Sequence, residues 1–112
     1  MTQWNQLTQA DQVDAIKAAS FHAPQLIFKH STTCSISGMA KNRLDRADAP
    51  SGVAFHYLDL LSYRPVSALV AETFNVHHES PQVLLIHQGA CIYDESHYGI
   101  TMDEIAEQVA AL

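Results

Sequence analysis

The sequence predicts a single α/β domain in which a mixed β-sheet of four strands is flanked by helices. Three observations predict this class: short apolar runs typical of buried strands, periodic apolar patterns typical of helices between them, and a two-residue turn near the C-terminus that implies an antiparallel hairpin. The chain has 112 residues, long enough to bury a core without disulfide or metal staples. We therefore expect one domain spanning residues 1–112.

Composition argues against several classes of function. The net charge is -6, and nucleic acids and anionic membranes both select basic patches instead. No apolar run approaches the ~18 residues needed to span a bilayer, and the N-terminus lacks a basic region followed by an apolar signal core. Only Cys34 and Cys91 carry thiols, which disfavours a disulfide framework. We expect a cytoplasmic protein without nucleic-acid or membrane partners, of undetermined oligomeric state.

The first half of the chain is expected to contain two helices and two strands. Thr8 is expected to cap the first helix, which ends within residues 21–24 at a proline. Residues 25–29 form a short apolar run typical of a buried central strand, and residues 53–58 are rich enough in β-branched and aromatic side chains for a second strand. The helix expected over residues 35–46 connects them, so the two strands should be parallel.

The second half is expected to contain two more strands between two helices. Arg64 and Pro65 begin a helix, because proline suits the first helical position. Residues 82–87 form the third apolar strand, and a Gln-Gly turn leads into the fourth strand over residues 90–94. Thr101 begins a capping box for the terminal helix. The predicted order is helix, β, α, β, α, β, β, α.

The junction between the first strand and the second helix carries one cysteine, Cys34. At the first turn of a helix, unpaired backbone N–H groups and the helix dipole favour the thiolate over the thiol. Ser37 stands three residues later, where a thioredoxin-type motif has its second sulfur, so the motif is Cys-x-x-Ser. This position predicts a reactive thiol.

The element order, with a cysteine after the first strand and a proline before the third, resembles the thioredoxin fold over essentially the whole chain. More narrowly, four blocks in order resemble the bacillithiol-system redox proteins called monothiol bacilliredoxins. One departure is Ser35, where that family usually has proline directly after the cysteine. The blocks are Lys29 to Ser37, Tyr63-Arg64-Pro65, His78 to Val83, and Ser96-His97 followed by Ile100-Thr101.

The resemblance implies a thioredoxin-like sheet with the predicted strands in the order 2-1-3-4 and an extra N-terminal helix. It also implies a monothiol thiol-disulfide oxidoreductase that uses Cys34 to remove bacillithiol, or a related low-molecular-weight thiol, from mixed disulfides on cytosolic proteins. With a single sulfur, the adduct on Cys34 must be resolved by a second thiol molecule or a partner reductase. The expected partners are S-thiolated proteins and the small thiol as co-substrate, with no permanently bound cofactor.

Several residues are expected to serve the thiol in such a fold. The hydroxyl of Ser37 is a hydrogen-bond donor to the thiolate, Thr33 and the backbone N–H groups of Ile36 and Ser37 are similar candidates, and Lys29 or His30 adds positive potential. In thioredoxin-like proteins the bond corresponding to Ser80-Pro81 is cis and faces the cysteine. Ser80 would then offer its backbone to a bound peptide or thiol. Ser96 and His97 should return to the same end of the sheet, beside the start of the last helix, whose N–H groups are expected to donate to a carboxylate of the thiol ligand.

The remaining cysteine and histidines are given structural roles. Strand spacing places Cys91 roughly 15 Å from Cys34, beyond the ~7 Å Cα separation that a disulfide allows, so no internal bond is expected. The seven histidines show no metal-ligand spacing, and His77 and His78 should be loop residues. His56 and His87 fall on strands and are expected to be hydrogen-bonded.

Two other functions remain open from the sequence. One is a module that holds a metal cluster or a small thiol through Cys34 without turnover, which an absorbance band on anaerobic reconstitution would favour. Monothiol glutaredoxins suggest it, although their Gly-Phe between Cys and Ser is not found here. The other is an interaction domain with an inert cysteine, which alkylation of Cys34 against pH would separate from a redox protein.

Overall fold

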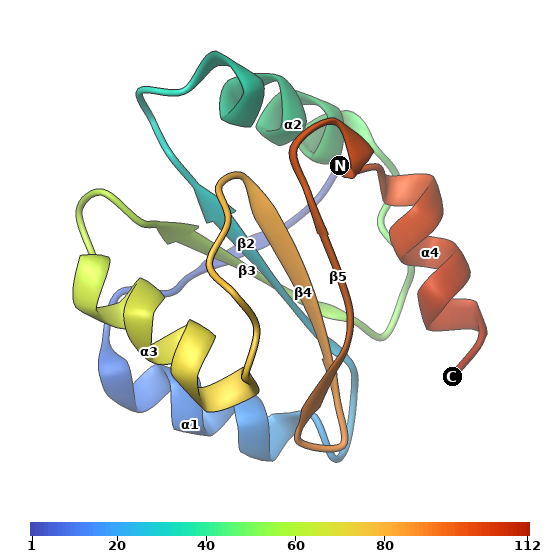
Figure 1. The fold of residues 1–112 in the computed structure, drawn as a ribbon. Coiled ribbons are helices and arrows are strands. Elements are labelled where there is room, and N and C mark those ends of the chain that lie inside the picture. Colours follow the sequence, from blue (N-terminus) through green and yellow to red (C-terminus); the bar gives the residue numbers. More distant parts are fainter.

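The computed structural model describes residues 1–112 as a central sheet covered by helices on both faces (Figure 1). The chain runs through five strands, four α-helices and a short 3₁₀ helix. None of the helices combines the length and the apolar character that a membrane-spanning segment requires. The elements are β1 Trp4–Gln6, α1 Ala10–Ala19, β2 Gln25–His30, α2 Ser35–Arg46, β3 Ala54–Asp59, α3 Arg64–Phe74, β4 Gln82–His87, β5 Ala90–Ser96, η1 His97–Gly99 and α4 Met102–Ala110.

The sheet has the order β1-β3-β2-β4-β5. The pairs β1–β3 and β2–β3 are parallel, and the pairs β2–β4 and β4–β5 are antiparallel. The central strand β2 is buried along its whole length, as its apolar run predicts. Gln88 and Gly89 join β4 to β5 with positive φ angles of 51° and 82°, which suit the twist of a two-residue hairpin.

The prediction of a four-stranded sheet is wrong, because β1 adds a fifth strand at the edge beside β3. Its three residues, Trp-Asn-Gln, carry no apolar alternation that would predict a strand. Packing of Trp4 holds the strand instead. The centroid of the indole ring lies 5.7 Å from that of Phe28 and 5.8 Å from that of Phe55, and its Nε1 donates a 2.6 Å hydrogen bond to Asp45.

The start of α1 also differs from the prediction. Gln9, not Thr8, is the N-cap. The side-chain oxygen of Gln12 accepts hydrogen bonds from the backbone N–H groups of Thr8 and Gln9, at 2.8 and 2.9 Å. Gln9 and Gln12 therefore form the start of this helix in place of the predicted Thr8 cap.

Two apolar clusters lie on the two faces of the sheet. One joins α1 and α3 to side chains such as Ile27 and Leu84, and the other joins α2 and α4 to Leu26 and Phe28. Figure 1 shows the same separation, with α1 and α3 on one side and α2 and α4 on the other. Because successive residues of a strand face opposite ways, neighbours on β2 contribute to different clusters.

Candidate functional site

Cys34 is the N-cap of α2, just beyond the end of the central strand β2. Its backbone is extended, with φ -104° and ψ 122°, and its side chain is half-buried. The N–H of Cys34 donates to the carbonyl of Ser31 at 3.2 Å, and its own carbonyl accepts from the N–H of Gly38 at 3.0 Å. The fold therefore holds the sulfur at the first turn of α2, where the sequence placed it.

The backbone around this sulfur carries unused donors. The N–H groups of Ser35, Ile36 and Ser37 donate to no acceptor within the chain, and no side chain caps the helix. Unpaired N–H groups at a helix N-terminus bear partial positive charge and attract anions. The predicted backbone donors, the N–H groups of Ile36 and Ser37, are thus available to a thiolate. The N–H group of Ser35, which was not predicted, is available as well.

The hydroxyl of Ser37 has a different role from the one predicted. Its oxygen lies 2.8 Å from Nδ1 of His30 and accepts a 3.0 Å hydrogen bond from the N–H of Ser31, and the side chain is fully buried. Ser37 therefore binds the end of β2 to the first turn of α2. The expected hydrogen bond from this hydroxyl to the thiolate of Cys34 is not formed.

The expected positive potential from Lys29 and His30 is also corrected. Adjacent strand residues face opposite sides of the sheet, so only one of the two can face α2. The buried ammonium of Lys29 binds the carbonyl of Ser67 and Nδ1 of His78, both at 3.2 Å, on the α3 side. His30 faces α2, but burial lowers its pKa from the ordinary 6.5, so its ring is neutral at pH 7.

Ser80 and Pro81 lie at the same end of the sheet as Cys34, and the peptide bond between them is cis. Lys29 pairs with Gln82 across the β2–β4 ladder, so the next position on each strand brings His30 opposite Pro81. The backbone N–H and carbonyl of Ser80 make no hydrogen bond within the chain, and its buried hydroxyl has no partner. Ser80 therefore presents unpaired backbone groups beside the end of β2.

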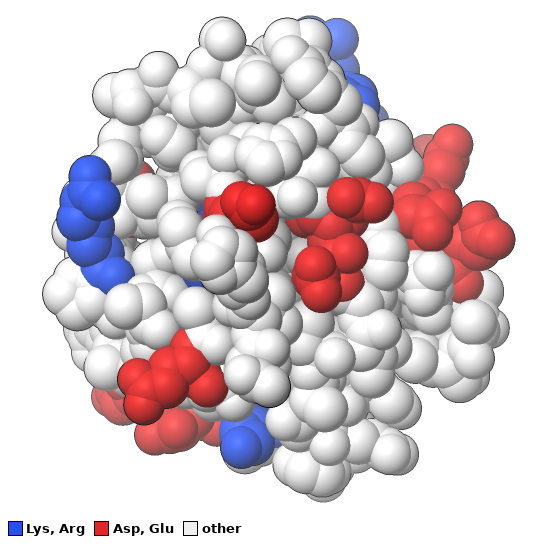
Figure 2. Space-filling model, in the orientation of Figure 1, with Lys and Arg blue, Asp and Glu red and all other residues white.

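Ser96 and His97 return to this end of the sheet as predicted. Ser96 pairs with Gln82, and the N–H of His97 donates to the carbonyl of Pro81 at 3.1 Å. The start of α4 beside them suits a carboxylate poorly, because Asp103 and Glu104 occupy its first turn. Figure 2 shows acidic side chains gathered over β5 and α4.

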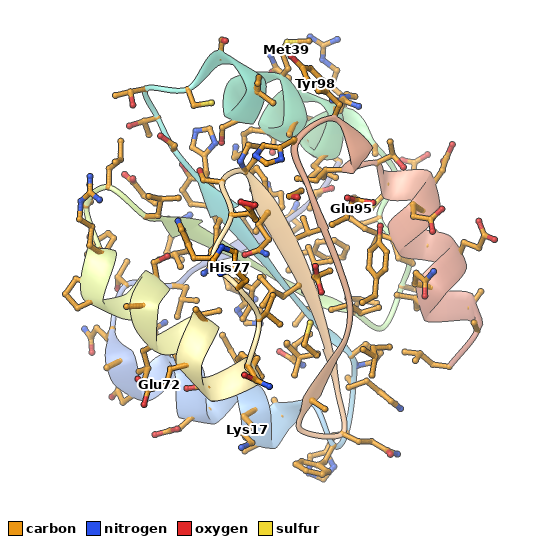
Figure 3. All side chains as sticks on the ribbon, viewed as in Figure 1. Lys17, Met39, Glu72, His77, Glu95 and Tyr98 are labelled. Atoms are coloured by element: carbon orange, nitrogen blue, oxygen red, sulfur yellow. The ribbon has the colours of Figure 1, made fainter.

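The other predicted residues lie nearby or take structural roles. Thr33 is exposed, with its hydroxyl 3.4 Å from that of Ser31. Helix α2 and η1 contact each other, and their apolar side chains Met39 and Tyr98, which were not among the predicted site residues, are largely exposed (Figure 3). No group of three or more His, Cys, Asp or Glu side chains is arranged to hold a metal ion.

Cys91 lies on β5 opposite Ile86, and Ile86 pairs with Gln25 at the start of β2. It is therefore at the end of the sheet away from Cys34, and both thiols are free. Burial raises the pKa of Cys91 to about 11, so its thiol stays protonated at neutral pH. The expected structural role for Cys91 agrees with these observations.

The two histidines on strands, His56 and His87, differ in their hydrogen bonding. Nε2 of His56 lies 2.8 Å from Oε1 of Gln25, which confirms the predicted hydrogen bond. Nδ1 of His87 is buried without a partner, so the same prediction is wrong there. His77 and His78 are exposed loop residues, as predicted, but His78 also accepts a hydrogen bond from Lys29.

Sequence reasoning missed a hollow on the α3 side of this end of the sheet. Its walls are Leu60, Arg64, Ser67, Ala68 and His78, and its volume is about 220 Å³. The block Tyr63-Arg64-Pro65 is part of the family resemblance, yet its place beside the loop after β3 depends on tertiary structure. The signal in the sequence was a cationic residue, Arg64, at the expected start of a helix.

Several solved structures with a similar arrangement are thioredoxin-fold proteins. One, provisionally described as an oxidoreductase with a thioredoxin fold, is 26% identical with a TM-score of 0.80, covering 91% of this chain and 89% of that chain. The thioredoxin of Malassezia sympodialis is 12% identical with a TM-score of 0.73, covering 99% and 91%. Mitochondrial thioredoxin 3 of Saccharomyces cerevisiae is 18% identical with a TM-score of 0.70, covering 97% and 95%.

The sequence itself matches one family over most of its length. Residues 5–105 match the family described as monothiol bacilliredoxin BrxC. That match spans β1 through the first turns of α4 and includes Cys34 and Pro81. A single sulfur at the start of α2 in a thioredoxin-like α/β fold fits this assignment and a thiol redox function in general. The chain therefore belongs to the monothiol bacilliredoxin family.

Proposed function

We propose that this protein is a monothiol thiol-disulfide oxidoreductase that removes bacillithiol, or a related low-molecular-weight thiol, from mixed disulfides on proteins. The observation that carries the proposal is the place of Cys34, a half-buried sulfur at a helix start with three unused N–H donors. The other thiol lies at the opposite end of the sheet. Chemistry at this site therefore proceeds with one sulfur of the chain.

In the first step, the thiolate of Cys34 attacks the sulfur of the small thiol within the mixed disulfide. A new S–S bond joins Cys34 to the small thiol as the bond to the target protein breaks. The target sulfur leaves as a thiolate and takes a proton from water. The donors of Ser35, Ile36 and Ser37 favour this step by stabilising the attacking thiolate.

In the second step, the adduct on Cys34 is resolved from outside the chain. A free molecule of the small thiol attacks as a thiolate at the sulfur of the bound small thiol. The products are a disulfide of two small-thiol molecules and the regenerated Cys34 thiolate. A partner reductase would serve the same purpose. The small thiol is thus a co-substrate, and the reaction requires no permanently bound cofactor.

In this proposal, the backbone of Ser80 binds the target protein or the small thiol. Its N–H and carbonyl are unpaired within the chain, so an extended peptide can pair with them in the manner of strand addition. Ser96 and His97 border the same place, because both adjoin the segment that begins with Pro81. The substrate would lie across the end of the sheet, next to Cys34.

Turnover on a thiolated protein tests this function. A target with one cysteine is converted to its bacillithiol mixed disulfide and incubated with excess bacillithiol and a trace of this protein. Intact mass then follows release of the target thiol. We expect catalytic release by wild type and Cys91→Ser, and release at the uncatalysed rate with Cys34→Ser. Stoichiometric transfer to Cys34 without turnover would instead indicate a thiol-binding module, and equal rates in all three proteins would refute the proposal.

A further inference from the structure

Lys29 is a buried cation without an anionic partner. Its side chain is fully buried in the central strand, and its ammonium binds two neutral acceptors, the carbonyl of Ser67 and Nδ1 of His78. An ammonium has three donors, so one remains unused. The single ion pair of the molecule joins Lys41 and Asp45, so no carboxylate of the chain neutralises Lys29. Buried charges are ordinarily paired, which makes this arrangement incomplete.

The side chains of His78 and Arg64 supply two further hydrogen-bond donors at the site of the Lys29 ammonium. Since lysine only donates, Nδ1 of His78 must accept from it, and the proton of the neutral ring then lies on Nε2. Partial burial of the ring lowers the pKa of His78 first, and the charges of Lys29 and Arg64 lower it further, so both cations act on one ring. Arg64, the exposed first residue of α3, forms no ion pair. Figure 2 shows basic atoms over the start of α3, apart from the acidic face.

These groups meet at a hollow at the same end of the sheet as the thiol. Arg64, Ser67 and His78 line the cavity of about 220 Å³, and Ser67 and His78 are the residues that bind the Lys29 ammonium. Another wall residue, Leu60, donates its N–H to the carbonyl of His30 at 3.0 Å, at the end of the strand that leads to Cys34. The hollow is smaller than the roughly 300 Å³ typical of whole-ligand pockets, so it suits one end of a small molecule.

We propose that this hollow binds a carboxylate of the low-molecular-weight thiol whose sulfur is exchanged at Cys34. Arg64 and the His78 Nε2–H are placed to donate to the carboxylate, and the ammonium of Lys29 neutralises its charge from beneath. Glu79, the acidic residue whose charge acts on His78, does not line the hollow. The start of α4, with its two acidic side chains, is the poorer of the two anion sites at this end of the sheet. The inference rests on the proposed function.

The test compares two small thiols on one target protein. The target cysteine is blocked with bacillithiol, which carries carboxylates, or with 2-mercaptoethanol, which carries none. The ratio of kcat/KM for the bacillithiol-blocked target to kcat/KM for the 2-mercaptoethanol-blocked target is measured for wild type, Arg64→Gln and Lys29→Met. Arg43→Gln, on the outer face of α2, is the matched control. Thermal unfolding of each variant verifies folding.

We expect Arg64→Gln and Lys29→Met each to lower the ratio by about tenfold, the size of one charge-assisted hydrogen bond. Arg43→Gln should keep the wild-type ratio. A wild-type ratio in Arg64→Gln or Lys29→Met, or a loss equally large for both thiols, would overturn the carboxylate site. If wild type released neither thiol, the proposed function itself would have failed, and the two failures are thus distinguishable.

Discussion

The hydroxyl of Ser37 lies 2.8 Å from Nδ1 of His30 and links the first turn of α2 to the last residue of β2. The same oxygen accepts the buried N–H of Ser31 at 3.0 Å. The segment between Ser31 and Ser37 carries Cys34. The buried hydroxyl of Ser37 therefore joins the two ends of the loop that holds the thiol. The serine of the Cys-x-x-Ser motif is therefore a structural clamp in this chain.

Removal of this clamp should destabilise the protein. Ser37→Ala leaves the buried N–H of Ser31 without an acceptor, so the free energy of unfolding should fall by about 1–3 kcal/mol. Ser35→Ala, in the same turn, changes an exposed side chain without hydrogen bonds and should stay within about 0.5 kcal/mol of wild type. Urea unfolding measures both variants. Equal stability of the two would exclude the clamp.

The two thiols should differ sharply in reactivity. Because burial raises the pKa of Cys91 to about 11, only about one molecule in ten thousand carries its thiolate at pH 7. We expect iodoacetamide to alkylate Cys34 more than a hundredfold faster than Cys91 in the folded protein, as measured by peptide mass over time. In urea the two rates should converge. Comparable rates in the folded state would contradict the assigned environments.

The stability of the protein should fall as pH falls from about 6.5 to about 4. Burial lowers the pKa of His56 from 6.5 to about 4, so in this window the unfolded chain binds a proton that the folded chain does not. The resulting loss is at most about 3 kcal/mol. His56→Gln should flatten the dependence, and His22→Gln, at an exposed position, should not. Urea unfolding at several pH values measures the free energy of unfolding of both variants. If that free energy falls with pH in His56→Gln as steeply as in wild type, the assignment to His56 is refuted.

The sequence was sufficient for elements with strong local signals. The apolar run of β2, the Gln-Gly hairpin, the proline at the start of α3 and the capping box of α4 each predicted an element that the structure contains. Strand β1 was missed because its three residues are held by tertiary packing of Trp4, which no local pattern reveals.

The candidate site was predictable in position and less so in detail. Cys34 and Pro81 follow from the order of elements, but the partners of Ser37 and Lys29 depend on which face each side chain takes. The alternation of β2 already implied that Lys29 and His30 diverge. The hollow beside Arg64 joins a strand, a helix start and a loop, and distant segments of this kind meet only in the folded chain.

The most direct test of the proposed role of Cys34 is the intact mass of the protein after incubation with bacillithiol disulfide, compared among wild type, Cys34→Ser and Cys91→Ser. The single-sulfur mechanism predicts one bacillithiol adduct on wild type and on Cys91→Ser, and none on Cys34→Ser. An adduct that persists in Cys34→Ser, or a wild-type mass lower by two hydrogens from an internal disulfide, would contradict the single-sulfur mechanism.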